Sequence, residues 1–66
     1  MTPRQLAAIG EELHGPRWRA ALARQLNVSY AAMRNYARGR RPIPGPVAVA
    51  AECLRNEKRL LEKMKG

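Results

Sequence analysis

The most restrictive feature of this sequence is the break at Asn27-Val28-Ser29, which separates two short segments whose apolar residues recur at helical spacing. Asparagine tolerates the left-handed backbone that a sharp turn requires, and serine is a strong helix N-cap. The segment before the break covers residues 16–26, with Pro16 suited to a first helical position, and the segment after it covers residues 29–38, before the helix stop Gly39. The sequence therefore predicts two short helices joined by a three-residue turn.

Each of these two helices carries an apolar stripe that must face a core. The stripe of the first is Trp18, Ala21, Leu22, Ala23 and Leu26, and that of the second is Val28, Ala32, Met33 and Tyr36. Ala23 is small enough to let the two helices cross closely. Trp18 is expected to be a core residue and not a platform for a ligand.

A further helix is predicted at the N-terminus. Thr2-Pro3-Arg4-Gln5 has the pattern of a capping box, in which Thr2 and Gln5 satisfy each other's backbone amides. Apolar residues then recur at helical spacing until His14-Gly15 supplies a stop, and Glu11 and Glu12 are expected to face solvent.

The last helix is predicted from Pro46 to Met64, after a non-helical connection in which Ile43 reaches the core. At 1.5 Å per residue it would be almost 30 Å long, roughly the diameter of a small domain. Cys53 on this helix is expected to pack as a small apolar side chain. The expected fold is all-α: one compact four-helix domain over residues 1–66, with a helix-turn-helix core at 16–39 and an extended C-terminal helix.

The charge of the chain indicates a polyanionic partner. The formal net charge is +8, and all five glutamates lie outside residues 13–51. That stretch contains seven arginines and no lysine, and the planar guanidinium suits phosphates and guanine edges better than an ammonium does. Nucleic acid is the first expectation and an anionic membrane surface the second.

Several other functions are disfavoured by what the chain contains. A chain of 66 residues buries only about 60% of its unfolded surface, which leaves little material for an enzyme cleft. One histidine, one cysteine and dispersed glutamates form no catalytic or metal-binding pattern. No run is long and apolar enough for a membrane span. We expect a cytoplasmic, non-enzymatic protein without a metal, cofactor or small-molecule ligand.

The residues from Trp18 to Ala51 closely resemble the phage Cro and repressor-like helix-turn-helix family. The resemblance rests on the pattern Leu22-Ala23-x-x-Leu26-Asn27-Val28-Ser29-x-x-x-Met33-x-x-Tyr36-x-x-Gly39 and on the Ile43-Pro44 connection. Small phage-encoded autorepressors, including anti-CRISPR-associated regulators, are similar. Asn27 stands where the family usually has glycine, Arg19 where glutamine is common, and Tyr36 where tryptophan is frequent.

The resemblance implies a sequence-specific regulator of transcription that binds double-stranded DNA in the cytoplasm of a bacterial host cell. Such a repressor would bind an inverted-repeat, palindromic operator as a homodimer. The implied base-reading residues are Ser29, Tyr30, Ala31, Arg34 and Asn35. The implied phosphate contacts are Arg19, Arg38, Arg40 and Arg41. Because the last helix exceeds the needs of the core, its residues Leu54, Leu60, Leu61 and Met64 are expected to form the dimer interface.

Two alternatives remain at this stage. One is a protein-interaction module of antitoxin or adaptor type that uses the same fold without reading DNA. The other is an amphipathic binder of membrane surfaces, which is disfavoured because the arginines follow caps and turns and do not line one apolar-backed helix. For Arg17 and Arg24, a phosphate contact and a solvated surface position both remain open.

Overall fold

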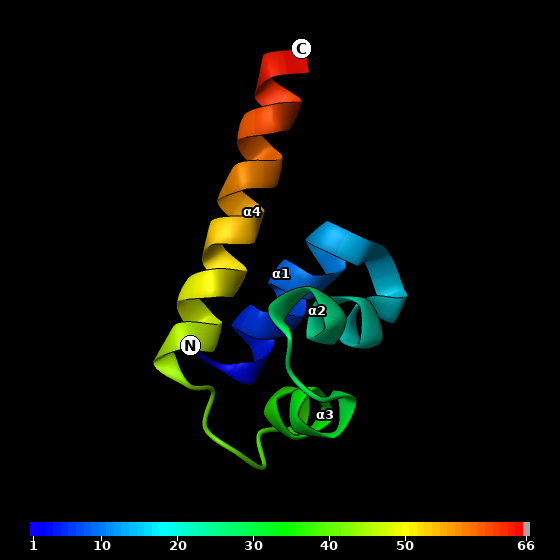
Figure 1. Cartoon of the computed structure of the whole chain (residues 1–66), viewed down its shortest axis with the longest axis vertical. Helices are drawn as coiled ribbons and strands as arrows, with labels where there is room; N and C mark the ends of the chain where they lie inside the picture. Colours follow the sequence, from blue (N-terminus) through cyan, green and yellow to red (C-terminus); the bar gives the residue numbers. More distant parts are fainter. Residues whose placement is uncertain (66) are drawn as a thin grey trace.

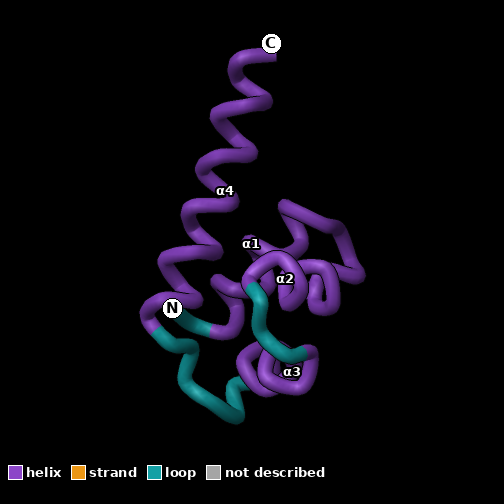
Figure 2. Tube along the Cα trace, in the orientation of Figure 1, coloured by secondary structure: helices purple, strands orange, loops and turns teal. Residues whose placement is uncertain are grey.

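The computed structural model describes residues 1–65 and contains four α-helices. They are α1 (Pro3–His14), α2 (Trp18–Leu26), α3 (Tyr30–Arg38) and α4 (Gly45–Lys65), with a 3₁₀ turn at Gly15–Arg17 between α1 and α2. Within residues 1–65 there is no strand, and short loops join the helices (Figure 2). The expected all-α class, the compact helical domain and the extended C-terminal helix are confirmed.

The long helix α4 defines the shape of the molecule. The principal extents are 39 × 22 × 20 Å, and α4 runs along the longest of them. The other three helices gather beside the N-terminal half of α4, and α3 lies at the end of the molecule opposite the C-terminus (Figure 1). The C-terminal half of α4 therefore extends beyond the helical core.

The first helix begins with the capping box that the sequence predicts. The backbone amide of Gln5 donates to Thr2 Oγ1 at 3.1 Å, and the amide of Thr2 donates to Gln5 Oε1 at 2.8 Å. Two of the amide groups that the first helical turn leaves without partners are thereby satisfied.

The second helix begins later than the sequence predicts. Pro16 lies in the 3₁₀ turn, and α2 begins at Trp18. Gly15 ends α1 with φ 77°, and Arg17 has the non-helical angles φ −99° and ψ 43°. The proline fixes its own φ but not the backbone of Arg17, so the turn stays separate from α2.

The turn between α2 and α3 has the geometry that its sequence indicates. Asn27 is left-handed at φ 58° and ψ 41°. The amide of Val28 donates to the carbonyl of Ala23 at 2.9 Å, which closes the end of α2, and Ser29 Oγ accepts from the amide of Ala32 at 3.1 Å, which caps α3. These bonds fix the direction of α3 relative to α2.

The core lies where α1, α2 and α3 meet the first turns of α4. Its buried apolar members are Leu6, Ile9, Trp18, Leu22, Ala23, Met33, Tyr36 and Ala51. Trp18 is only 1% exposed, which confirms its expected core position, and Ile43 packs against the core from the connection before α4. The only α4 member of this set is an alanine, so α4 approaches the core closely at Ala51.

A polar contact attaches the second half of α4 to α1. Glu12 Oε2 and Oε1 accept hydrogen bonds from Arg59 Nε and Nη2, each at 2.7 Å, and Lys58 Nζ donates to the main-chain oxygen of Glu12. The expectation that both glutamates face solvent is confirmed for the exposed Glu11, whereas Glu12 is half-buried and paired with Arg59. Beyond this contact, residues 60–65 are all exposed.

Candidate nucleic-acid interface

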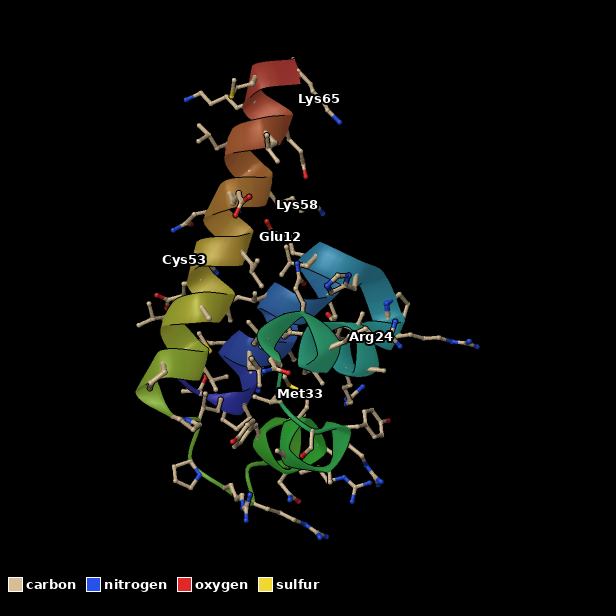
Figure 3. The ribbon with its side chains drawn as sticks, viewed as in Figure 1. Glu12, Arg24, Met33, Cys53, Lys58 and Lys65 are labelled. Carbon is tan, nitrogen blue, oxygen red and sulfur yellow. The ribbon has the colours of Figure 1, made fainter. Side chains whose placement is uncertain are left out.

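The surface of α3 is divided between a core side and an exposed side. Met33 and Tyr36 are buried, and Figure 3 shows Met33 between α2 and α3. On the other side Tyr30, Ala31 and Arg34 are exposed. This division follows the helical period, so α3 offers its outer side to a partner without losing core contacts.

Five residues from α3 and the following loop line one shallow depression. They are Ala31, Arg34, Asn35, Arg38 and Arg40. The depression thus joins three of the predicted base-reading residues to two of the predicted phosphate contacts. Asn35 is half-buried, so only its outer part is available to a ligand.

The remaining predicted residues of this region lie at its edges. Arg41 is exposed but does not line the depression. Ser29 is exposed, and its hydroxyl oxygen already accepts the amide of Ala32, so its main role is to begin α3. Its hydroxyl hydrogen is still available as a donor.

A second depression lies between the start of α2 and the start of α3. Its lining residues are Pro16, Arg17, Arg19, Ala20 and Tyr30. Arg19 is held over the buried Trp18 ring, with 4.9 Å between its Cζ atom and the ring centre. Tyr30 therefore links the exposed side of α3 to two arginines, Arg17 and Arg19, which line the same depression.

Tyr30 and Arg34 also contact each other along α3. The Cζ atom of Arg34 lies 5.9 Å from the centre of the Tyr30 ring, within the range of a cation–π contact. The two residues are four apart, which places them one above the other on the same side of the helix.

No sequence pattern places Arg4 in this region. A Cβ atom placed on Gly39 would lie 3.5 Å from Pro3 Cγ, so the start of α1 is next to the end of α3. The exposed Arg4 follows Pro3 directly and adds a positive charge at this end of the molecule. Because the two segments are 36 residues apart in the chain, only tertiary structure brings them together.

The electrostatic character of the region is uniform. The carboxylates of the described residues lie on α1 and α4, namely Glu11, Glu12, Glu52, Glu57 and Glu62. Every charged residue of α2, of α3 and of their connections is an arginine. Such a surface attracts phosphate and contains no acidic group to oppose it.

The predicted dimer residues occupy two environments on α4. Leu60, Leu61 and Met64 are 59%, 52% and 75% exposed. Leu54 instead packs against the core of its own chain. The sequence did not single out Val49, which is 61% exposed.

Cys53 is exposed, so the expectation that it packs as a small apolar side chain is wrong. In Figure 3 it lies on the side of α4 that faces away from the other helices, whereas Lys58 lies on the side facing α1. The outer side of α4 therefore carries exposed Val49, Cys53, Leu60 and Met64, with spacings of four, seven and four residues that keep them in one stripe.

Other chemistry finds little support in residues 1–65. His14 Nε2 is 2.7 Å from Gln25 Oε1, which ties the end of α1 to α2. No group of three or more His, Cys, Asp or Glu side chains in the described part of the chain is arranged to hold a metal ion. No helix in this part of the chain combines the length and the apolar character needed to cross a membrane.

Comparisons of the chain with protein-family models, with curated proteins and with solved structures find no match in any of the three.

Proposed function

We propose that this protein is a sequence-specific regulator of transcription that inserts α3 into the major groove of double-stranded DNA. The observation that carries the proposal is the exposed side of α3, where Arg34 and Asn35 lie in one depression with Arg38 and Arg40. A major groove about 12 Å wide admits an α-helix, and the exposed residues of that helix meet the base edges.

The residue types on α3 suit base recognition. The guanidinium of Arg34 can donate two hydrogen bonds to O6 and N7 of guanine, and the amide of Asn35 can pair with N6 and N7 of adenine. Ala31 and the Tyr30 ring present apolar surface for a thymine methyl group. Ser29 lies beside them at the start of the helix.

The arginines around α3 supply contacts to the DNA backbone. Arg19 lies at the start of α2, Arg38 at the end of α3, and Arg40 and Arg41 in the loop that follows. Such contacts fix the position of the protein on the duplex without reading sequence. Each neutralised phosphate releases counterions, so binding should weaken steeply as salt is raised.

We further propose that the protein binds as a homodimer through α4. The exposed Leu60 and Met64, together with Val49, provide the apolar surface. Leu61 instead lines a depression with Leu13 and Leu54 on the side of α4 that faces α1, so it is not part of this surface. In Figure 1, α3 and the C-terminus of α4 lie at opposite ends of the molecule. If two α4 helices pair in parallel, with the two-fold axis of the dimer running along the pair, both α3 helices lie at the same end of the dimer. Such a pair suits an inverted repeat with half-sites about 34 Å apart. Repression would follow when the dimer blocks polymerase at a promoter.

Selection of bound sequences from a random duplex pool tests the proposal directly. We expect a palindromic consensus, and we expect affinity for that consensus to fall steeply between low and moderate salt. A pool without enrichment, together with binding that does not respond to salt, would contradict the proposal and favour the protein-interaction module.

A further inference from the structure

The contact between Tyr30 and Arg34 has a consequence for what α3 can recognise. Tyr30 is 51% exposed, yet its ring lies 5.9 Å from the Arg34 guanidinium carbon and also lines the depression beside Arg17 and Arg19. The ring therefore stands between the phosphate-binding side of α2 and the base-reading side of α3.

The ring limits the orientations of the arginine. A guanidinium on an open helix surface samples many rotamers, and binding to one base would require it to give up that freedom. Contact with the ring removes part of this freedom before DNA is bound, which favours the bound geometry. No second aromatic side chain on α3 is available for this purpose, since Tyr36 is buried.

The positions of the Tyr30 ring and the Arg34 guanidinium also define what lies next to the guanine that Arg34 would bind. A guanidinium donates through its edge, so its flat faces point toward the neighbouring base pairs when it bonds O6 and N7. The guanidinium carbon of Arg34 lies over the Tyr30 ring at 5.9 Å from its centre, and Tyr30 is one helical turn nearer the start of α3. Its apolar ring then lies beside the major-groove edge of the adjacent base pair, where the C5 position of a pyrimidine carries a methyl group in thymine and a hydrogen in cytosine.

We infer that Tyr30 and Arg34 read two adjacent base pairs as one unit, a guanine and beside it a pyrimidine that carries a C5-methyl group. Thymine and 5-methylcytosine share this group, whereas unmodified cytosine and uracil lack it. Tyr30 is thus a positioning residue for Arg34 and makes its own contact with the methyl group. The inference rests on the proposed function and adds a chemical class of base step to it.

The first test changes one chemical group of the DNA at a time. In the consensus obtained by selection, the thymine beside the guanine is replaced by deoxyuridine, which removes only the methyl group. Affinity of the wild-type protein should fall about fourfold, the effect of burying one methyl-sized group. Replacing that T·A pair by C·G should also weaken binding, and methylation of the new cytosine at C5 should restore part of the loss.

The second test uses Tyr30→Ala and its conservative control Tyr30→Phe. Tyr30→Ala should abolish the response to deoxyuridine and reduce the preference for guanine at the Arg34 position, which a bidentate contact sets at about 5- to 150-fold. Tyr30→Phe keeps the ring and should retain both properties. Unfolding curves of the two variants should match, because the side chain is exposed.

The outcomes separate the inference from the proposed function. If the protein binds its consensus with a steep salt dependence but deoxyuridine and Tyr30→Ala leave affinity and guanine preference unchanged, the inference is overturned and the proposed function stands. A consensus without a guanine beside a thymine overturns it as well. Absence of salt-dependent binding to any duplex overturns both.

Discussion

Gly10 of α1 lies directly against the indole ring of Trp18 at the start of α2. A Cβ atom placed on Gly10 would lie 2.7 Å from Trp18 Cγ and closer still to two other ring atoms. Since Trp18 is 1% exposed and is the largest fully buried side chain, the ring has no free space into which it could move. The closeness of α1 to α2 thus depends on the absence of a side chain at position 10.

Substitution of Gly10 by alanine should destabilise the protein, although alanine is the better helix former. Overpacking a core by one methyl group costs about 1 to 3 kcal/mol, and a rigid indole places the cost at the upper end of that range or above it. Urea denaturation measures the change in the free energy of unfolding. Gly45→Ala is the matched control, because nothing lies within 4 Å of its Cβ position, and it should be neutral or slightly stabilising. Equal stabilities for the two variants would mean that Trp18 does not lie against Gly10.

The pair formed by Glu12 and Arg59 should make stability depend on pH. The hydrogen bond from Arg59 has the largest effect on the Glu12 carboxyl and lowers its pKa below the ordinary value of 4.5. Burial opposes part of this shift, and the charges of Arg59, Arg55 and Lys58 lower the pKa further. A carboxyl with a lowered folded-state pKa stabilises the fold above its unfolded pKa and loses that effect as pH falls through the folded value.

We therefore expect wild type to be more stable than Glu12→Gln near neutral pH, with the difference disappearing as the pH falls through the ordinary carboxyl pKa of 4.5 and then through the lower folded-state pKa. Denaturation curves at several pH values measure this. Glu52→Gln provides the control, because Glu52 is exposed on α4 and takes part in no ion pair in the described residues. A difference for Glu12→Gln that stays constant across the pH range would show that the ion pair does not form in solution.

Helix ends were predictable from the sequence because they depend on short-range chemistry. The Thr2 and Gln5 cap, the left-handed Asn27 and the Ser29 cap all involve groups within three residues of one another. The α2 start was not predictable in the same way. Pro16 is compatible with both a 3₁₀ turn and an α-helix, and the backbone of Arg17 decides between them.

The contacts of α4 could not be predicted from the sequence, because apolar residues are spread over more than half of the circumference of this helix. Periodicity therefore could not show which side meets α1, and Cys53 was expected to pack as a small apolar side chain although it is exposed. Glu12 and Arg59 are 47 residues apart, so no local pattern predicts their pairing. For the candidate site, the exposed residues of α3 follow from the helical period, whereas the position of Arg17 beside Tyr30 depends on how α2 and α3 pack.

Two arginines should differ in what they contribute to DNA binding. Arg34→Ala should cost about 1 to 3 kcal/mol and relax the preference at one base pair, because it removes a fork to a base. Arg40→Ala should weaken binding to all sequences about equally and reduce the salt slope by about one unit, because it removes a phosphate contact. Titrations on the consensus and on single-base variants at several salt concentrations measure both effects.

Arg24→Ala is the control for these two variants. Arg24 is exposed on α2 and extends away from α3 in Figure 3, so its removal should change the base preference at no position. If Arg34→Ala behaved like Arg24→Ala in affinity and in preference, the assignment of α3 as the reading helix would be wrong.

The single cysteine of the chain reports how two α4 helices pair. Cys53 lies in the outer stripe between Val49 and Leu60, and in a parallel pair the two copies of Cys53 sit side by side at the same height. A disulfide needs a Cα separation of about 4.4 to 6.8 Å, which neighbouring positions in such a pair provide. In an antiparallel pair that crosses between Cys53 and Leu60 the two thiols would be at different heights, and the two α3 helices would lie at opposite ends of the dimer.

Mild oxidation of the native protein should therefore yield a disulfide-linked dimer on a non-reducing gel, and this dimer should still bind the palindromic consensus. Leu60→Asp combined with Met64→Asp should abolish the cross-link, because charges replace the apolar contact. For a positional control, Cys53→Ser is combined with Glu62→Cys, which moves the thiol to the side of α4 where Glu62 pairs with Lys58 next to α1. Equal cross-linking at both positions would indicate random collision, and a cross-linked dimer unable to bind the consensus would rule out the parallel pair.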